Sequence, residues 1–242
     1  MIVIGIDTAC RVGGVAVVQA GRLLGGELFG LEAGHSERLL PALERLLDAL
    51  QLQPDQIDGI AVCLGPGSFT GLRIGLAAAK GLAYAWELPL VGVSTLKASA
   101  WTFKGVDAMI CASLDARRES VYRAWYDGRT LAGSGPAPPE ERVSVDAVAQ
   151  EAAEAWAAGR QVILVGDGAP AVMSAIEARR GRGEAAAAVA MAPFGAEVQR
   201  PANVACIGAE ELKLGRRDDP FSIVPNYLRR SEAERRWLQR QS

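Results

Sequence analysis

The feature that most constrains the fold is an order of elements that occurs twice along the chain. In the first half, the apolar run IVIGID ends at Asp7 and is followed by GVAVV, a Gly-Arg turn and LLGGELF, which predict an antiparallel meander of three strands. In the second half, AMICASLD ends at Asp115 and is followed by SVYRAWY, DGR and TLAG. The repeat predicts an internally duplicated α/β protein.

Helices and a further strand follow each meander in the same order. In the first half, leucines on one face predict a helix over residues 36–50, then come the strand GIAVCL, the turn GPG and a helix through Ala77 to Tyr84. In the second half, a helix is expected at 144–158, followed by QVILV, GDG and a helix at about 170–180. Both halves therefore read β-β-β-α-β-α.

The break between the halves predicts two lobes. The segment WTFKGVD interrupts the pattern, which places an N-terminal lobe at 1–103 and a C-terminal lobe at 104–242. The C-terminal lobe carries extra segments: 181–202 is expected to be a loop with one alanine-rich helical turn, and a helix is expected from about residue 203. The arginine-bearing tail is expected to be exposed.

Two such halves, each with an aspartate at the end of its first strand, resemble the duplicated two-lobed fold of the actin, Hsp70 and sugar-kinase (ASKHA) superfamily. Its members bind nucleotide in the cleft between the lobes, with those aspartates near the phosphates and metal. The resemblance implies a candidate nucleotide or anion site formed by Asp7, Gly65, Gly67, Ser68, Arg73, Asp115, Gly166 and Gly168. Alternatively, an aspartate between a strand and a turn accepts hydrogen bonds from its own backbone.

The glycine-rich stretch GPGSFTGLRIG matches neither common nucleotide motif. A Walker A loop needs Gly-Lys-Ser/Thr, whereas Gly71 is followed by Leu72 and Arg73. The glycine spacing G-x-G-x-x-x-G also departs from the Rossmann fingerprint. Ser68 is a candidate helix N-cap, so free backbone N–H groups there could hold an anion. The other interpretation is a tight turn that lets the helix pack closely.

Composition excludes several classes of function. The single histidine, His35, excludes every two-histidine metal site, including H-E-x-x-H. The four cysteines, at positions 10, 63, 111 and 206, are scattered, which is typical of free thiols in a reducing cytoplasm. A formal net charge of −2 gives no general attraction for nucleic acid. The N-terminal MIVIGID has no basic n-region and an early Asp, which argues against a signal peptide, and no apolar run approaches the ~18 residues needed to span a bilayer.

Five motifs in order resemble the bacterial TsaB (YeaZ) family: HSERLLP, GPGSFTGLRIGLAAAKGLA, VGVSTL, LDARRESVY and PNYLR. The resemblance implies a part in making threonylcarbamoyladenosine beside the tRNA anticodon. In that family's pathway TsaD, a paralogue, transfers the threonylcarbamoyl group, TsaB pairs with TsaD, and the ATPase TsaE completes the assembly. TsaB is the non-catalytic, glycoprotease-like accessory subunit. The single histidine of this chain agrees with a non-catalytic role beside a catalytic TsaD, because TsaD carries its metal on paired histidines.

The resemblance also implies that the partner surface lies on the first two helices. Helical spacing selects Leu39, Leu43, Leu46, Leu72, Leu76 and Lys80 as contacts. Packing inside the protein's own core is the alternative for the same side chains. Arg73 is expected near this interface or near a bound phosphate.

Other functions stay open on the sequence. The cleft could serve an ATP-binding phosphotransferase or ATPase that uses Asp7 and Asp115, and the tail could touch tRNA directly. For the accessory subunit we expect that no cofactor is required. The sequence does not decide whether the chain binds nucleotide weakly, whether it forms a homodimer, or how many copies enter the complex. Contact with tRNA is expected mainly through the complex, in the cytoplasm and away from membranes.

Overall fold

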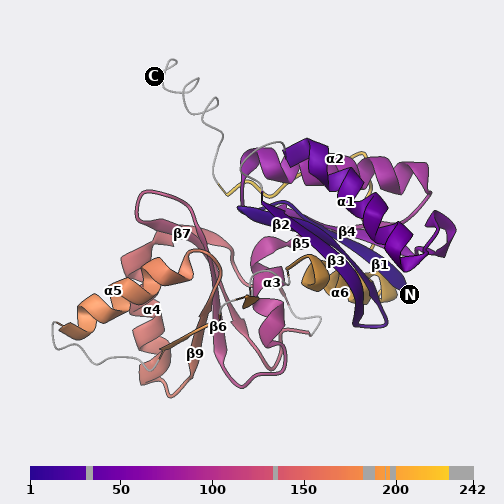
Figure 1. Ribbon diagram of the computed structural model, residues 1–242. Helices are drawn as coiled ribbons and strands as arrows, with labels where there is room; N and C mark the ends of the chain where they lie inside the picture. Colours follow the sequence, from indigo (N-terminus) through magenta and orange to yellow (C-terminus); the bar gives the residue numbers. More distant parts are fainter. Residues whose placement is uncertain (31–34, 133–135, 182–188, 194, 197–199, 229–242) are drawn as a thin grey trace, which may run out of the picture.

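The protein is built around two five-stranded sheets (Figure 1). The computed structural model describes the chain apart from residues 31–34, 133–135, 182–188, 194, 197–199 and 229–242. The first sheet has the order β3-β2-β1-β4-β5. Its strands are β1 (Ile2–Asp7), β2 (Val12–Gln19), β3 (Arg22–Gly30), β4 (Gly59–Gly65) and β5 (Leu90–Ser94).

The second sheet repeats the topology of the first. Its order is β10-β9-β6-β7-β8. Written in the opposite direction, β8-β7-β6-β9-β10 corresponds strand by strand to β3-β2-β1-β4-β5 of the first sheet. In each sheet the first strand pairs antiparallel with the second and parallel with the fourth. The strands are β6 (Met109–Asp115), β7 (Ser120–Asp127), β8 (Glu141–Ser144), β9 (Val162–Val165) and β10 (Val189–Met191). The internal duplication and the two-lobed α/β fold predicted from the sequence are therefore confirmed.

The helices cover the sheets and join the two lobes. Helices α1 (His35–Leu50) and α2 (Phe69–Ala85) lie on one face of the first sheet, and α6 (Arg200–Lys213) lies on the other (Figure 1). In the second half, α4 (Val145–Ala157) and α5 (Ala169–Gly181) pack together beside β9. Short 3-10 turns occur at Pro54–Gln56 (η1) and Trp101–Phe103 (η2).

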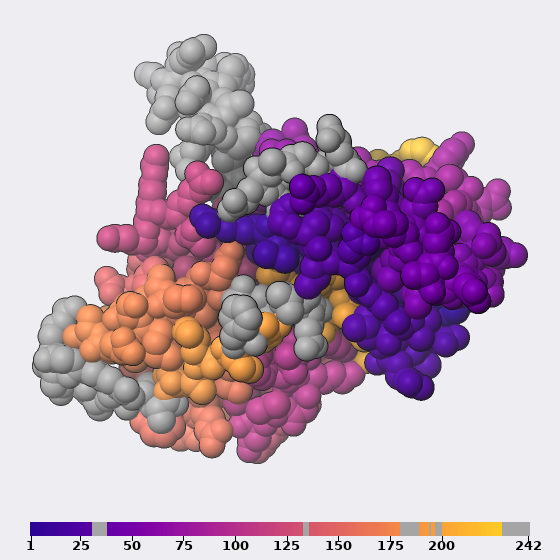
Figure 2. Space-filling model, in the orientation of Figure 1, coloured from indigo at the N-terminus to yellow at the C-terminus, as the bar shows by residue number. Residues whose placement is uncertain are grey.

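The last helix of each half packs on the sheet of the other half. Helix α3 (Thr95–Ala100) follows the first sheet but packs on β6 and β7, whereas α6 packs on β1, β4 and β2. This exchange gives the lobes a common core, in which Leu96 from α3 and Ile207 from α6 are buried in one cluster. Figure 2 shows the indigo-violet first half and the orange second half as adjoining masses. The lobe boundary near residue 103 stays a prediction, because α6 belongs to one half in sequence and to the other in packing.

Three local predictions for the second half need correction. Residues 130–132 of the run TLAG form a turn, Gly133 lies outside the described residues, and the strand that pairs with β7 is β8, which begins at Glu141. The segment 181–202, expected as a loop, contributes the edge strand β10 in its described part. The last helix begins at Arg200, before the expected residue 203, with Pro201 in its first turn, where a proline sacrifices no helical hydrogen bond.

Among the described residues, no helix is both long enough and apolar enough to cross a bilayer.

Candidate functional site: the cleft aspartates and the α1–α2 face

Asp7, the aspartate at the end of β1, is completely buried against an arginine. Its Oδ2 lies 2.7 Å from Nε of Arg200, and its Oδ1 accepts a hydrogen bond from the backbone N–H of Ala9 at 2.9 Å. Arg200 also donates from Nη2 to the carbonyl of Val12 at 3.0 Å. Burial lowers the pKa of Arg200, but the charge and hydrogen bond of Asp7, together with Cys10 and Cys63, leave the pKa raised. The negative charge of Asp7 is therefore paired with a positive charge inside the protein.

The sequence signal for this pairing is weak. Arg200 lies 193 residues from Asp7, at the start of a helix that was expected to begin later. An arginine beside a proline at a helix start does not indicate burial, because arginine is almost never fully buried unless it is paired. The exchange of α6 onto the first sheet brings the two side chains together.

The first glycine turn packs directly on the loop after β1. A Cβ atom at Gly71 would overlap the carbonyl oxygen of Thr8, and one at Gly67 would lie 2.5 Å from the carbonyl oxygen of Ala9. The N–H of Ser68 donates to that same Ala9 carbonyl at 2.7 Å. The hydroxyl of Ser68 accepts from the N–H of Gly71 at 3.2 Å, which confirms the predicted N-cap of α2. These contacts favour close packing as the role of Gly67, Ser68 and Gly71.

Gly65 completes this turn at the end of β4. It has φ +112°, a conformation that glycine adopts readily, and a Cβ there would lie 2.8 Å from the carbonyl oxygen of Asn226.

The second glycine turn repeats this arrangement but leaves its aspartate exposed. Gly166 and Gly168 lie against the end of β6, where the N–H of Gly168 donates to the carbonyl of Ser113 at 3.0 Å. Asp115 is exposed, and its Oδ1 accepts from the N–H of Arg117 at 2.7 Å. Its own N–H donates to Oδ1 of Asp167 at 2.8 Å. The two duplicated aspartates therefore differ: Asp7 is locked to an arginine, whereas Asp115 caps a surface turn.

The described residues contain no group of three His, Cys, Asp or Glu side chains placed to hold a metal ion. The candidate nucleotide residues form one turn in each lobe, and the two turns are coupled: burial raises the pKa of Asp167 in the second turn, and Arg200, the partner of Asp7, opposes that shift. Nucleotide or anion binding at these turns stays a prediction.

The five leucines selected as partner contacts face the protein's own core. The buried set is Leu39, Leu43, Leu46, Leu72 and Leu76. They pack between α1, α2 and the sheet, which favours the alternative interpretation of core packing, and a contact of these side chains with a partner stays a prediction. Lys80 is half-buried on α2.

Other side chains of α1 and α2 do reach the surface. Leu40 is 49% exposed and Tyr84 is 72% exposed, although neither was singled out from the sequence. Leu40 lies next to the buried Leu39 and therefore outside the inward-facing stripe, which helical spacing alone could have indicated.

A groove of ≈ 390 Å³ lies beside Leu40, between α1, the segment that follows it and the C-terminal end of α2. Leu43, Leu47, Leu52, Leu82 and Trp86 contribute apolar surface, and Glu44 and Asp48 contribute carboxylates. An apolar groove with a few polar groups is the usual form of a binding site.

A C-terminal strap, residues 216–228, crosses the first lobe. The N–H of Asn226 donates to the carbonyl of Leu64 at 2.7 Å, and the Nδ2 of Asn226 donates to Oε2 of Glu140 at 2.9 Å. The hydroxyl of Ser94 also donates to Glu140. Burial raises the pKa of Glu140, and the two hydrogen bonds oppose that shift only in part. Glu140 thus ties the strap and the start of α3 to the second lobe.

Arg73 is held by the end of this strap. Its guanidinium lies 3.9 Å from the centroid of the Phe69 ring, and its Nε donates to the hydroxyl of Tyr227 at 2.9 Å. The rings of Phe69 and Tyr227 lie 4.8 Å apart. This places the PNYLR motif against the GPGSFTGLRIG motif, although 154 residues separate Arg73 from Tyr227. The contact assigns Arg73 an intramolecular partner, and its approach to a phosphate or a partner protein stays a prediction.

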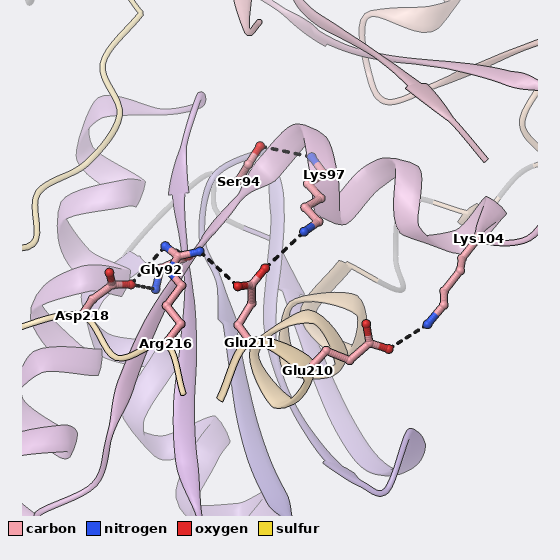
Figure 3. A network of polar contacts seen from close by, with 8 residues as sticks. All are labelled: Gly92, Ser94, Lys97, Lys104, Glu210, Glu211, Arg216 and Asp218. Atoms are coloured by element: carbon pink, nitrogen blue, oxygen red, sulfur yellow. Dashed lines mark hydrogen bonds and ion pairs between the residues drawn. The ribbon is translucent and has the colours of Figure 1, made fainter. Parts of the chain in front are cut away.

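A polar network fixes the strap and α6 to β5 and α3 (Figure 3). Glu211 of α6 lies 3.3 Å from Nζ of Lys97 and 3.7 Å from Nη1 of Arg216. Asp218 accepts from Arg216 at 3.3 Å and from the N–H of Gly92 at 2.7 Å. The ion pair of Lys104 with Glu210, at 2.7 Å, adds a second link between the lobes. These charges therefore have partners within the protein and hold the lobes together.

The two lobes share one topology, in which an aspartate ends the central strand and a glycine turn follows a neighbouring parallel strand. This is the two-lobed, actin-like fold. The crystal structure of a ROK hexokinase from Thermus thermophilus shares this fold, with a TM-score of 0.52 and 16% identity over 89% of this chain and 100% of that chain.

Sequence and structure comparisons narrow the class to a family. The family model "TsaD: tRNA N6-adenosine threonylcarbamoyltransferase" matches residues 31–237. The tRNA threonylcarbamoyladenosine biosynthesis protein TsaB of Bacillus subtilis is 29% identical over 242 residues, with 100% of both chains covered. YeaZ from Pseudomonas aeruginosa superposes with a TM-score of 0.66 and 26% identity, covering 94% of this chain and 99% of that chain. The chain belongs to the TsaB (YeaZ) family.

Proposed function

We propose that this chain is the non-catalytic partner and activator of a TsaD protein, which transfers the threonylcarbamoyl group to the adenosine next to the tRNA anticodon. The role in tRNA threonylcarbamoyladenosine biosynthesis follows from the family; the division of labour within the complex is our proposal. TsaE is the expected third component, and tRNA contact is expected mainly through the complex.

The observation that carries the proposal is the buried Asp7–Arg200 ion pair. In the superfamily, the corresponding aspartate stands near the phosphates and metal. Here its side chain is 0% exposed and already paired, so moving it to a ligand would leave an arginine buried without a counter-charge. Such a separation is strongly unfavourable in a protein interior. The first half of the duplicated cleft is therefore organised for stability rather than for catalysis.

The exposed face of α1 and α2 supports the partner role. Leu40 and the apolar groove, which includes Trp86, offer contact surface, while the leucines below them keep the two helices fixed on the sheet. Apolar and aromatic side chains that reach the surface together are typical of protein interfaces.

Mixing this chain with TsaD from the same organism, followed by size-exclusion chromatography with light scattering, tests the proposal. We expect a stable mixed species, with binding weakened at least about tenfold by Leu40→Arg, since burying an unpaired charge at an interface costs more than 1.4 kcal/mol. The matched control is Leu214→Arg, which changes a leucine that is 72% exposed after α6, a helix on the opposite face of the sheet. Equal binding by wild type and Leu40→Arg would remove this face from the interface.

ATP hydrolysis by the isolated chain would instead support the phosphotransferase or ATPase alternative. Asp115 is the aspartate free to serve it, because it is exposed whereas Asp7 is not. The non-catalytic role that we propose predicts no ATP hydrolysis by the isolated protein, either for the wild type or for Asp115→Asn.

A further inference from the structure

The groove on the α1–α2 face has a definite chemistry. Its apolar part is formed by leucines from α1 and α2 together with Trp86, and its volume of ≈ 390 Å³ suits one large aromatic side chain with a neighbour. Glu44 and Asp48, one turn apart on α1, are both exposed and line the same groove. A ligand that fits must therefore combine an aromatic or aliphatic anchor with flanking positive charge.

The chain's last fourteen residues, 229–242, have this combination. Their sequence RRSEAERRWLQRQS holds five arginines against two glutamates. Trp237 and Leu238 lie between Arg235–Arg236 and Arg240. An indole buries a large apolar area at little entropic cost, and arginine forms strong paired hydrogen bonds with carboxylates. The segment thus complements the groove in both apolar surface and charge.

The same chain can reach its own groove. The strap is anchored at Tyr227, whose ring packs on Phe69 in the first turn of α2. Leu82 and Trp86 lie 13 and 17 residues further along the chain from Phe69, which at 1.5 Å per residue corresponds to about 20–25 Å. Ten residues of chain from Tyr227 to Trp237 span up to about 33 Å when extended. A segment tethered this closely has an effective concentration of about a millimolar, which favours its own groove over that of a second copy.

We propose that residues 229–242 bind in the α1–α2 groove of their own chain, with Trp237 and Leu238 against the apolar part and the flanking arginines at Glu44 and Asp48. The docked segment and TsaD would then share part of one face. This last consequence rests on the proposed function; the docking itself does not.

Fluorine NMR on the full chain labelled with 5-fluorotryptophan tests the docking. The protein has five tryptophans, each assignable by replacement with phenylalanine. We expect the Trp237 resonance to differ in position and width from that of a free peptide with the sequence of 229–242. We also expect Trp237→Ala to shift the resonance of Trp86. The matched control is Trp156→Phe, which changes a tryptophan on α4 and must leave Trp86 unmoved.

Reversing the charges of the groove tests whether the Trp237 resonance reports docking at Glu44 and Asp48 rather than some other change around the tryptophan. The variant Glu44→Lys with Asp48→Lys alters two exposed positions, so it should fold, and unchanged resonances of Trp101 and Trp125 would verify this. We expect the Trp237 resonance to move to the free-peptide position in this variant and to return when Arg235→Glu and Arg236→Glu are added.

A wild-type Trp237 resonance identical to that of the free peptide, or a Trp86 resonance indifferent to Trp237→Ala, would overturn the proposal. So would a Trp237 shift that disappears on dilution, because that result would assign the groove to a second copy. These results do not involve TsaD, so failure of the docking is distinguishable from failure of the proposed function.

Discussion

At the scale of single residues, the duplicated aspartates show how one ancestral position can serve two purposes. The end of each first strand could be located from the sequence, because an apolar run stops at Asp7 and again at Asp115. Their different environments could not, since the partner of Asp7 is brought in by α6 from the far end of the chain.

Replacing Asp7 by asparagine should destabilise the protein by about 3–5 kcal/mol, because it leaves the Arg200 charge buried without its partner. Urea unfolding of the variant and the wild type measures the difference. Asp115→Asn is the matched control: an exposed aspartate whose turn hydrogen bond the amide oxygen can still accept should cost about 1 kcal/mol or less. Equal stability of the Asp7→Asn variant and the wild type would contradict a structural role for the pair.

Glu140 gives the stability a dependence on pH with a definite sign. Its pKa in the folded protein is raised above the ordinary value of 4.5 by burial, so the folded state holds its proton more tightly than the unfolded state does. Folding stability should therefore fall as pH rises through the window above 4.5, where the unfolded chain has lost this proton and the folded chain has not.

Glu140→Gln removes this contribution, so its free energy of unfolding relative to wild type should increase as pH rises through the same window. Urea unfolding over that pH range measures the slope, which is independent of any fixed offset from altered hydrogen bonds to Ser94 and Asn226. A difference that is constant with pH would show that Glu140 titrates normally.

At the scale of elements, the sequence predicted α2 well because its start has a local signal, a serine N-cap after a glycine turn. It failed where the signal is tertiary. The leucines of α1 and α2 show a helical period, but a period identifies an apolar stripe without saying whether the stripe meets the protein's own sheet or a partner. The run TLAG was expected as a strand by analogy with the first half, whereas β7 pairs with 141–144 after a proline-containing connection.

Alanine substitution at two glycines of α2 should have opposite effects on stability, because one glycine is closely packed and the other is not. Gly71→Ala places a methyl group onto the Thr8 carbonyl and should force α2 away from β1, at a cost of about 2 kcal/mol or more. Gly81→Ala has no atom within 4 Å of the added methyl and should stabilise the helix by about 0.5–1 kcal/mol. Thermal unfolding of both variants measures the two signs. Stabilisation by Gly71→Ala would refute the close-packing role of the glycine turn.

At the scale of the whole molecule, the sequence predicted the duplication and the two-lobed fold, because the order of elements recurs over more than half the chain. It could not predict the packing of α6 on the first sheet, nor the strap that returns to the first lobe, since both depend on contacts between residues more than 100 positions apart. These long-range connections hold the lobes together and leave the α1–α2 face exposed, which is the face we propose for a partner.

A threonylcarbamoyl-transfer assay tests the central claim, that this chain activates a paralogue and performs no chemistry itself. The assay combines TsaD and TsaE from the same organism with tRNA, threonylcarbamoyl-AMP and ATP, and is run with and without this chain. We expect no modified tRNA from this chain alone, efficient modification only when TsaD and this chain are both present, and a loss of about tenfold or more with Leu40→Arg but not with Leu214→Arg. Full modification by TsaD and TsaE without this chain, or modification by this chain without TsaD, would contradict the account.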